Sequence, residues 1–246
     1  MDKFHDSAGI PWEGRAFGAN PFSDDDGSTP TDIAQALAKE SFSLTNLHRS
    51  LLPTRLLVPL IAQLGDSEVG AHGKAVDKSA ELSIVAVATP DGQSAIPAFT
   101  SVSQMQLWKS DARPVPIEAT RVALAAIAEG HNRVVLNPGT DSIGLRRPFL
   151  AALAQQKTWL SPGDNPEVDE LVESAIYNFS EITSFLLLDA DPAGTLRQAE
   201  LTIQLGVRSG LGSDELSELL LQFSQQLQSI RFLELVDSVS LKVIAS

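Results

Sequence analysis

The sequence predicts an α+β protein with two small mixed-sheet α/β domains in tandem and an N-terminal extension. Hydrophobic residues make up 43% of the 246 positions, which is enough to fill packed cores. Short apolar runs, typical of strands, alternate with helical patterns. The charge changes near residue 160, because residues 51–160 carry 9 acidic and 10 basic side chains whereas residues 161–246 carry 14 and 4. We therefore expect an extension and helix at residues 1–45, a first domain at 46–160 and a second at 165–246.

The N-terminal extension is expected to form an extended tail. Its first 30 residues contain prolines and glycines at intervals and show neither the strand period nor the helical period. Large apolar side chains nevertheless occur there, among them Ile10, Trp12, Phe17 and Phe22. Such groups dock either on the protein's own core or on a partner. Trp12 and Phe22 are the candidates for a partner contact, because large aromatic side chains anchor many interfaces.

A helix should end the N-terminal segment, and the first domain should continue with strands and helices in alternation. Thr29 can cap a helix that starts at Pro30, which suits the first helical position. Pro59 cannot donate to a β-ladder, so the strand that contains it should have an edge or a bulge there. The expected elements are helices at 43–52, 101–108, 118–129 and 148–155, and strands at 55–62, 81–88, 93–99, 115–117 and 133–136.

The second domain should follow a linker at residues 161–166, where two prolines, a glycine and polar residues interrupt the pattern. A helix over 167–179 and strands over 182–188 and 199–207 are expected next. Ser213 can cap a long helix that ends near Gln228. The apolar runs 230–236 and 239–244 are then interpreted as strands.

Composition excludes several classes of function. The chain has no cysteine, which rules out disulfides, thiolate metal sites and a cysteine nucleophile. Its net charge of −13 should repel nucleic acid and anionic lipid, since phosphate binding needs clustered Lys and Arg. The longest apolar runs, such as 55–62, are far shorter than the roughly 20 residues of a membrane span. The N-terminus lacks a secretory signal. We expect a cytoplasmic protein without direct contact to membrane or nucleic acid.

Catalytic side chains do not assemble into a known pattern. None of the four histidines has a metal-ligand spacing, and we expect them at surface or boundary positions. Thr100 and Ser101 lie between a strand and a helix, where a nucleophile could be exposed, but a nucleophile elbow is missing. The capping role of Ser101 already explains its hydroxyl. A hydrolase using Thr100 or Ser101 remains an alternative, while the expectation is no enzyme, no cofactor and no metal.

The most suggestive spot for a ligand is the turn Asn137-Pro138-Gly139 with Arg146 and Arg147. Two cations near a turn that follows a strand can hold an anion or a carboxylate. In the competing interpretation, Asn137 and Gly139 serve only the turn, and the arginines are solvated or pair with acids. A third possibility is that the arginines face the acidic second domain or an acidic partner surface.

Between residues 55 and 155 the chain contains, in this order, Leu57-Val58-Pro59, residues 96–101 (Ile-Pro-Ala-Phe-Thr-Ser), Trp108, Pro114-Val115 and residues 135–139 (Val-Leu-Asn-Pro-Gly). By the order and spacing of these motifs, residues 55–155 resemble the N-terminal domain of the SseB family of bacterial proteins. Residues 167–246 are similar in pattern to the family's C-terminal domain. The tail with Pro11-Trp12-Glu13-Gly14 and residues 22–28 resembles an extension found in one bacterial branch.

The resemblance implies a cytoplasmic protein that is regulatory or binding rather than catalytic, because the family has no assigned catalytic residues. We therefore expect a non-catalytic adaptor or regulatory protein that acts by binding another protein. The first alternative is a sensor of a small molecule or anion at the Asn137–Gly139 turn and the nearby arginines. The second is the hydrolase.

Overall fold

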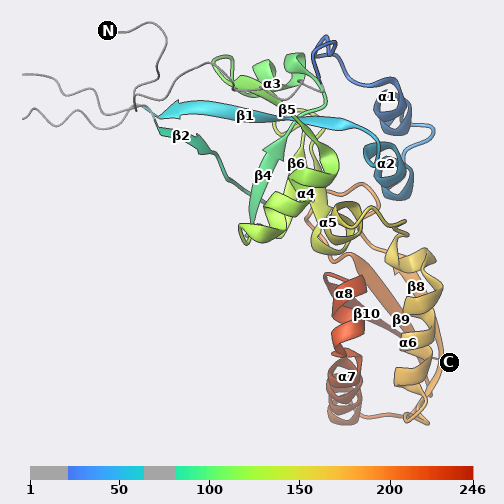
Figure 1. Cartoon of the computed structure of the whole chain (residues 1–246). Coiled ribbons are helices and arrows are strands. Elements are labelled where there is room, and N and C mark those ends of the chain that lie inside the picture. The colour runs from blue at the N-terminus through green and yellow to red at the C-terminus, as the bar shows by residue number, and fades with distance from the viewer. Residues whose placement is uncertain (1–21, 64–80, 246) are drawn as a thin grey trace, which may run out of the picture.

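Two apolar cores divide the chain. The computed structural model describes residues 22–63 and 81–245 (Figure 1). One cluster of buried residues runs from Ile33 to Trp159 and another from Val168 to Val236. We call residues 22–160 the N-terminal unit and residues 161–245 the C-terminal unit. Helices and small mixed or antiparallel sheets occur in both, which confirms the predicted α+β class.

The N-terminal unit contains two sheets that meet at the isolated bridge between Leu57 and Phe99. The order of the first sheet is β2-β1-β5 and that of the second is β3-β4-β6-β7. The elements are α1 (Thr31–Leu37), α2 (Leu44–Leu51), β1 (Arg55–Gln63), β2 (Glu81–Ile84), β3 (Val87–Ala88), β4 (Ser94–Ala98), α3 (Val102–Trp108), β5 (Arg113–Glu118), α4 (Ala119–Ala128), β6 (Arg133–Leu136), β7 (Ile143–Arg146) and α5 (Arg147–Ala154).

Strand β1 lies in the centre of its sheet, although it contains Pro59. It pairs with β5 from Arg55 to Leu60 and with β2 only from Leu60 onward. At Pro59 the strand is therefore paired with β5 alone, and its partner there is Pro114, which also lacks an amide hydrogen. The missing donor thus costs no ladder bond on the β2 side, which is why a proline is tolerated in a central strand.

Two local expectations for this unit were wrong, and one strand was missed. Residues 81–88 form two strands in different sheets, because β2 pairs with β1 whereas β3 pairs with β4. Thr29 does not cap α1; its hydroxyl bonds the Thr100 hydroxyl (3.1 Å), and the helix begins at Thr31 without a side-chain cap. The short strand β7 was not expected, and Gly144 within it weakens any strand pattern.

The described part of the N-terminal extension docks on its own unit. The Gly27 carbonyl accepts from the Val102 amide (2.9 Å), and Arg55, which is buried, bonds the Ser28 carbonyl and the Asp25 carboxylate. Helix α1 also belongs to the first core, since Ile33 is fully buried there. Trp12 lies outside the described residues.

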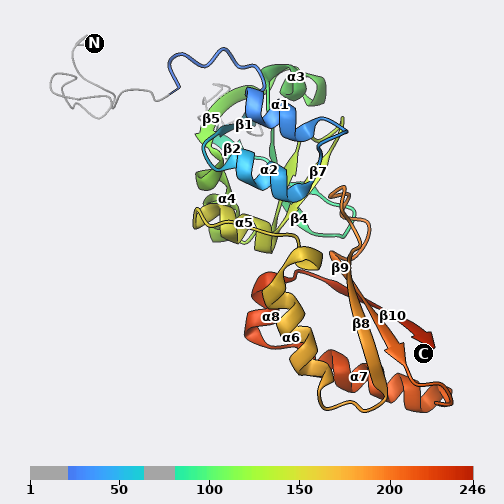
Figure 2. The same ribbon diagram turned by 90° about the vertical axis from the view of Figure 1, so that its right-hand side faces the viewer.

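The C-terminal unit is a three-stranded sheet with helices on one face (Figure 2). The sheet order is β10-β9-β8, with β8 antiparallel and β10 parallel to the central strand. The elements are the 3₁₀ turn η1 (Pro162–Asp164), α6 (Pro166–Ile176), β8 (Ile182–Asp189), β9 (Leu201–Val207), α7 (Ser213–Leu227), α8 (Ile230–Leu235) and β10 (Val239–Ala245).

The run 230–236 is a helix, so the predicted strand was wrong. Ser229 caps α8 by accepting the Phe232 amide (3.2 Å), and Phe232 is buried while Ile230 and Leu233 are exposed. Short apolar runs fit a helix and a strand equally well from sequence alone. A parallel pair such as β9 and β10 also requires a crossover connection, and α7 with α8 supplies it.

The face of this sheet away from the helices, which we call the outer face, is uncovered in the described structure. The inner face packs Phe185, Leu187, Ile203 and Leu205 into the second core. By alternation along each strand, the outer face carries Ser184, Leu186, Leu188, Thr202, Gln204, Ser240, Lys242 and Ile244. Among the described helices, none is long and apolar enough to cross a bilayer.

Candidate functional site at the junction of the two units

Two buried arginines of the N-terminal unit stand side by side on the β6–β7 hairpin. Arg133 and Arg146 are partners in the antiparallel register, and each is about 5% exposed. The hairpin reverses at Asn137 and Gly139, whose φ angles of 49° and 86° suit an asparagine and a glycine. A buried guanidinium needs a counter-charge, because transfer out of water without one is costly.

The C-terminal unit supplies that counter-charge. Asp237, which follows α8, accepts two hydrogen bonds from Arg133 (2.8 and 2.6 Å) and one from Arg146 (3.2 Å). Asp191, at the end of β8, accepts from Arg146 (2.8 Å). Asp91 of the N-terminal unit also bonds Arg133 (2.9 Å). These paired hydrogen bonds between charged groups join segments that are 91 and 104 residues apart in the chain.

Hydrogen bonds and ion pairs keep Asp191 and Arg133 in their charged forms despite burial. Burial alone would raise the pKa of Asp191, but hydrogen bonds from Thr195 and Arg146 outweigh it and hold that pKa below its ordinary value. Burial likewise acts to lower the pKa of Arg133, and the bonds to Asp237 and Asp91 raise it instead. Asp191 and Arg133 therefore stay charged across the physiological range.

A buried leucine of the C-terminal unit packs against the N-terminal unit beside the ion pairs. Leu196, in the loop between β8 and β9, is 2% exposed and packs with Ala95 and Val135 of the N-terminal unit. Gly144 makes room for it, since a Cβ atom there would lie 2.2 Å from Leu196 Cγ. The Gly144 amide donates to the Gly194 carbonyl (2.7 Å), which pairs the outer edge of β7 with the same loop.

Glu200 is an unusual acid in this junction. It is 7% exposed, and its Oε2 atom accepts from the Asp237 amide (2.7 Å). Burial raises the pKa of Glu200 to about 7, and the Asp237 charge adds to the rise while the two arginines oppose it. Glu200 therefore changes its charge near neutral pH, in contrast to Asp191, whose pKa is lowered.

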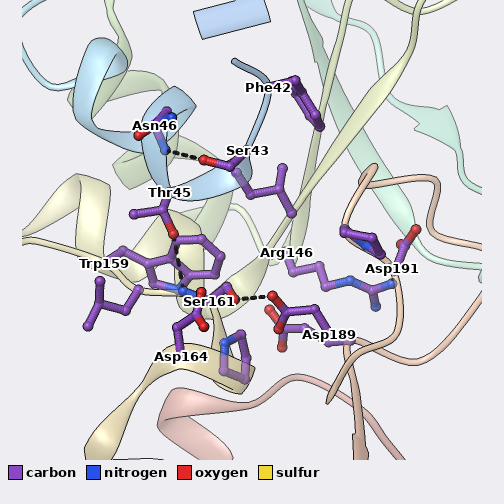
Figure 3. Close-up of a pocket in the computed structure, with 15 residues that line it drawn as sticks. Phe42, Ser43, Thr45, Asn46, Arg146, Trp159, Ser161, Asp164, Asp189 and Asp191 are labelled. Atoms are coloured by element: carbon purple, nitrogen blue, oxygen red, sulfur yellow. Dashed lines mark hydrogen bonds and ion pairs between the residues drawn. The ribbon is translucent and has the colours of Figure 1, made fainter. Parts of the chain in front are cut away.

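A cavity of about 330 Å³ opens next to this network, between the two units (Figure 3). Its walls come from the start of α2, the segment from Trp159 to Asp164, Arg146, and the ends of β8 and β9. The Ser161 hydroxyl bonds the Asp189 carboxylate, and the Ser161 amide donates to the Thr45 hydroxyl (3.3 Å). Hydrogen bonds to both units therefore hold Ser161 in the wall of the cavity.

The structure separates the parts of the predicted anion site. Asn137 is buried, and its side chain accepts from the Thr100 amide (3.0 Å). Pro138 is buried, whereas Gly139 is exposed and its amide donates to the Ser142 hydroxyl (3.2 Å). Leu136 pairs with Ile143 at one end of the hairpin and Arg133 with Arg146 at the other, about 10 Å away along the strands.

The two predicted arginines also differ from each other. Arg146 bonds Asp191 and Asp237 of the acidic unit, which is the third possibility drawn from the charge distribution. Arg147 is exposed. Phe22 is half-buried in the docked segment, and Trp12 lies outside the described residues. A binding role for each of these residues stays a prediction.

The two hydroxyls considered for a hydrolase, those of Thr100 and Ser101, bond structural neighbours. The Thr100 hydroxyl bonds Thr29 and Asn137, and Ser101 caps α3 by accepting the Gln104 amide (3.2 Å). His131 Nδ1 lies 2.9 Å from the hydroxyl of Ser94, which is exposed. Within the described ranges, no carboxylate bonds that histidine, and no cluster of His, Asp and Glu could hold a metal.

Of the two histidines in the described ranges, His131 is half-buried as expected, whereas the expected position of His48 was wrong. It is 1% exposed, packs edge-on against Phe149 at a centroid distance of 4.7 Å, and lies near Trp159. Burial lowers the pKa of His48 to about 4, so the ring is neutral in the folded protein. Helix α2 places it on the core side with Leu47 and Leu51.

Comparison with known proteins finds a family match within the N-terminal unit. Residues 33–152 match the family model of the SseB protein N-terminal domain. The matched segment starts inside α1 and ends inside α5, and it includes both junction arginines. No curated protein matches the chain, and no solved structure does.

Proposed function

We propose, from the match of residues 33–152 to the SseB N-terminal domain, that the protein is a non-catalytic cytoplasmic adaptor of the SseB family that binds another protein. The proposal extends the family assignment to the C-terminal unit. It places the partner on the outer face of the C-terminal sheet. The exposed aliphatic side chains of that face are the observation that carries it.

The outer face offers apolar area without a covering element in the described structure. Leu186, Leu188 and Ile244 are 51%, 39% and 40% exposed. Gln204 pairs with Leu186 on one side and with Lys242 on the other, and Ser240 bonds Thr202 (2.6 Å), so uncharged polar groups fill the centre. The exposed leucines of β8 and Ile244 of β10 therefore flank a polar centre, and exposed apolar area on one face of a sheet is typical of interaction surfaces.

The charge of the C-terminal unit favours a neutral or basic protein as the partner. Residues 161–246 carry 14 acidic and 4 basic side chains, and Lys242 is the one cation among the outer-face residues named above. Nucleic acid requires a cluster of cations. A second copy of this chain would bring two equally acidic units together, which is unfavourable. A partner with aliphatic side chains and a basic rim is complementary to this surface.

The experiment compares three forms of the protein in affinity capture from the native host. The forms are the wild type, the face variant Leu186→Glu with Leu188→Glu, and the control Leu124→Glu. Leu124 is 58% exposed on α4 of the N-terminal unit, so the control makes the same chemical change elsewhere. A captured protein is then purified, and its affinity for all three forms is measured by titration.

We expect the wild type and the control to bind the same purified partner, and the face variant to bind it at least about tenfold more weakly, which corresponds to about 1.4 kcal/mol. All three forms should unfold at similar urea concentrations, because exposed substitutions change stability little. Equal affinity of the face variant and the wild type for the captured partner would refute the proposal.

A further inference from the structure

The cavity between the units has more negative charge on its walls than the protein itself neutralises. Four acids line it, namely Asp164, Asp189, Asp191 and Glu200, together with a single cation, Arg146. Arg146 already pairs with Asp191 (2.8 Å) and with Asp237. Among the described residues, no Lys or Arg forms an ion pair with Asp189 or Glu200. The wall thus presents carboxylates that lack a counter-ion.

The two acids without an ion pair come from neighbouring strand ends, Asp189 at the end of β8 and Glu200 directly before β9. The Ala190 amide donates to the Glu200 carbonyl (3.0 Å), directly after Asp189. Neutral groups hold both side chains in place: the Ser161 hydroxyl and the Gly163 amide (2.9 Å) bond Asp189, and the Asp237 amide bonds Glu200. Glu200 Oε1 receives no hydrogen bond within the described part of the chain, although the residue is more than nine-tenths buried.

We propose that this cavity binds a small primary amine, whose ammonium group donates hydrogen bonds to Asp189 and Glu200. The ammonium would supply the missing counter-charge, and its three donors match carboxylate oxygens. The proposal is independent of the protein-binding role, because the outer face of the sheet does not line this cavity.

The remaining walls suit the carbon body of such a ligand. Phe42, Leu44, Trp159 and Leu160 also line the cavity, and Figure 3 shows the Trp159 ring beside Ser161. Aromatic rings attract cations and also contact aliphatic carbon. The volume of about 330 Å³ lies at the lower end of the range for ligand pockets, which favours a small molecule.

Other ligand classes fit the cavity less well. An anion would meet the four acidic side chains of the wall. A metal ion needs several ligands at fixed geometry, and no group of three or more His, Asp or Glu side chains among the described residues is placed to hold one. An uncharged ligand would leave the two carboxylates without a counter-ion.

The test uses the full-length protein with benzylamine and n-butylamine as probes, and benzyl alcohol and 1-butanol as uncharged controls of similar shape. Binding is measured by calorimetric titration near pH 7 in two buffers that differ in ionisation enthalpy. Thermal unfolding with increasing probe is a second readout, since a ligand that binds the folded state raises the midpoint.

We expect the amines to bind and to raise the unfolding temperature, and the alcohols to do neither. Binding of an ammonium beside Glu200 favours the charged carboxylate, so the titration should release protons to the buffer. Glu200→Gln should weaken the amine at least about tenfold and abolish the proton release, because one charge-assisted hydrogen bond is lost. Asp189→Asn should weaken it by a similar factor.

The matched control is Glu173→Gln, which makes the same change at an exposed position of α6. It should bind the amines as the wild type does. Equal responses to amine and alcohol would overturn the proposal, as would the absence of any binding. Unchanged amine affinity in both Glu200→Gln and Asp189→Asn would show that the amine binds elsewhere and would also overturn it.

Discussion

Replacing Asp237 by alanine should destabilise the protein by about 3 kcal/mol. Asp237 is 11% exposed in its side chain and accepts hydrogen bonds from both buried arginines. Removing one partner of a buried ion pair costs about 3–5 kcal/mol, because the other charge remains buried. The lower end applies here, since Arg133 retains Asp91 and Arg146 retains Asp191.

Urea unfolding followed by circular dichroism measures this loss. With a slope of about 3 kcal/mol per molar urea, the midpoint should fall by about 1 M. Glu173→Ala, which removes an exposed acid without an ion pair among the described residues, is the control and should stay within about 0.5 kcal/mol of the wild type. A loss below about 1 kcal/mol for Asp237→Ala would mean that the arginines do not depend on this carboxylate, and the reasoning would fail.

Three further predictions follow from the junction and the first core. Leu196→Ala should lower the free energy of unfolding by about 2–5 kcal/mol in chemical denaturation. Adding Gly144→Ala should recover part of that loss, because the new methyl group occupies the space of the removed side chain. A double variant that loses the sum of the two single losses would contradict the packing of Leu196 on Gly144. Glu200 has a pKa near 7 in the folded protein and an ordinary value of 4.5, so the folded state binds more protons than the unfolded state between pH 4.5 and 7. The free energy of unfolding should therefore fall by roughly 3 kcal/mol as the pH rises through this range. Glu200→Gln should remove this pH dependence, and an unchanged dependence would refute the raised pKa of Glu200. His48 has a pKa near 4 in the folded protein, so the free energy of unfolding should fall as the pH drops from 6.5 toward 4. His48→Leu should flatten that fall, and a pH profile identical to that of the wild type would count against the lowered pKa of His48.

Local chemistry explains why most elements could be predicted from the sequence. Ser101 caps α3 as its spacing predicts, the helix expected from Ser43 is present as α2, and Gly130 follows α4 with a positive φ of 78°. The turn at 89–92 and the strand that follows it also agree. These features depend on neighbours within a few residues, so the pattern is visible in the chain itself.

The elements that were not predicted from the sequence share a different cause. Strand β7 has four residues and a glycine, and its strand conformation depends on pairing with β6. Helix α8 carries an apolar run that suits either conformation, and the crossover between parallel strands decides the outcome. Tertiary contact overrides weak local preference at both places.

The junction was only partly predictable for the same reason. The acidic second half indicated that arginines could face it, and Arg146 was among the residues singled out. The identity of Asp237 and Asp191 as partners could not be inferred, because they lie 91 and 45 positions away. Leu196 has a positive φ of 57° in a loop without a period, and no sequence signal marks it as an interface residue.

Hydrogen exchange of the Gly144 amide tests most directly whether the two units are joined as described. This amide lies on the outer edge of β7 and donates to the Gly194 carbonyl of the other unit at 2.7 Å. If the units are joined, it should be protected to the same degree as the amides of the central strand β6. Exchange at the rate of an exposed edge strand, with β6 still protected, would show that the C-terminal unit does not stay on the hairpin and would contradict the account.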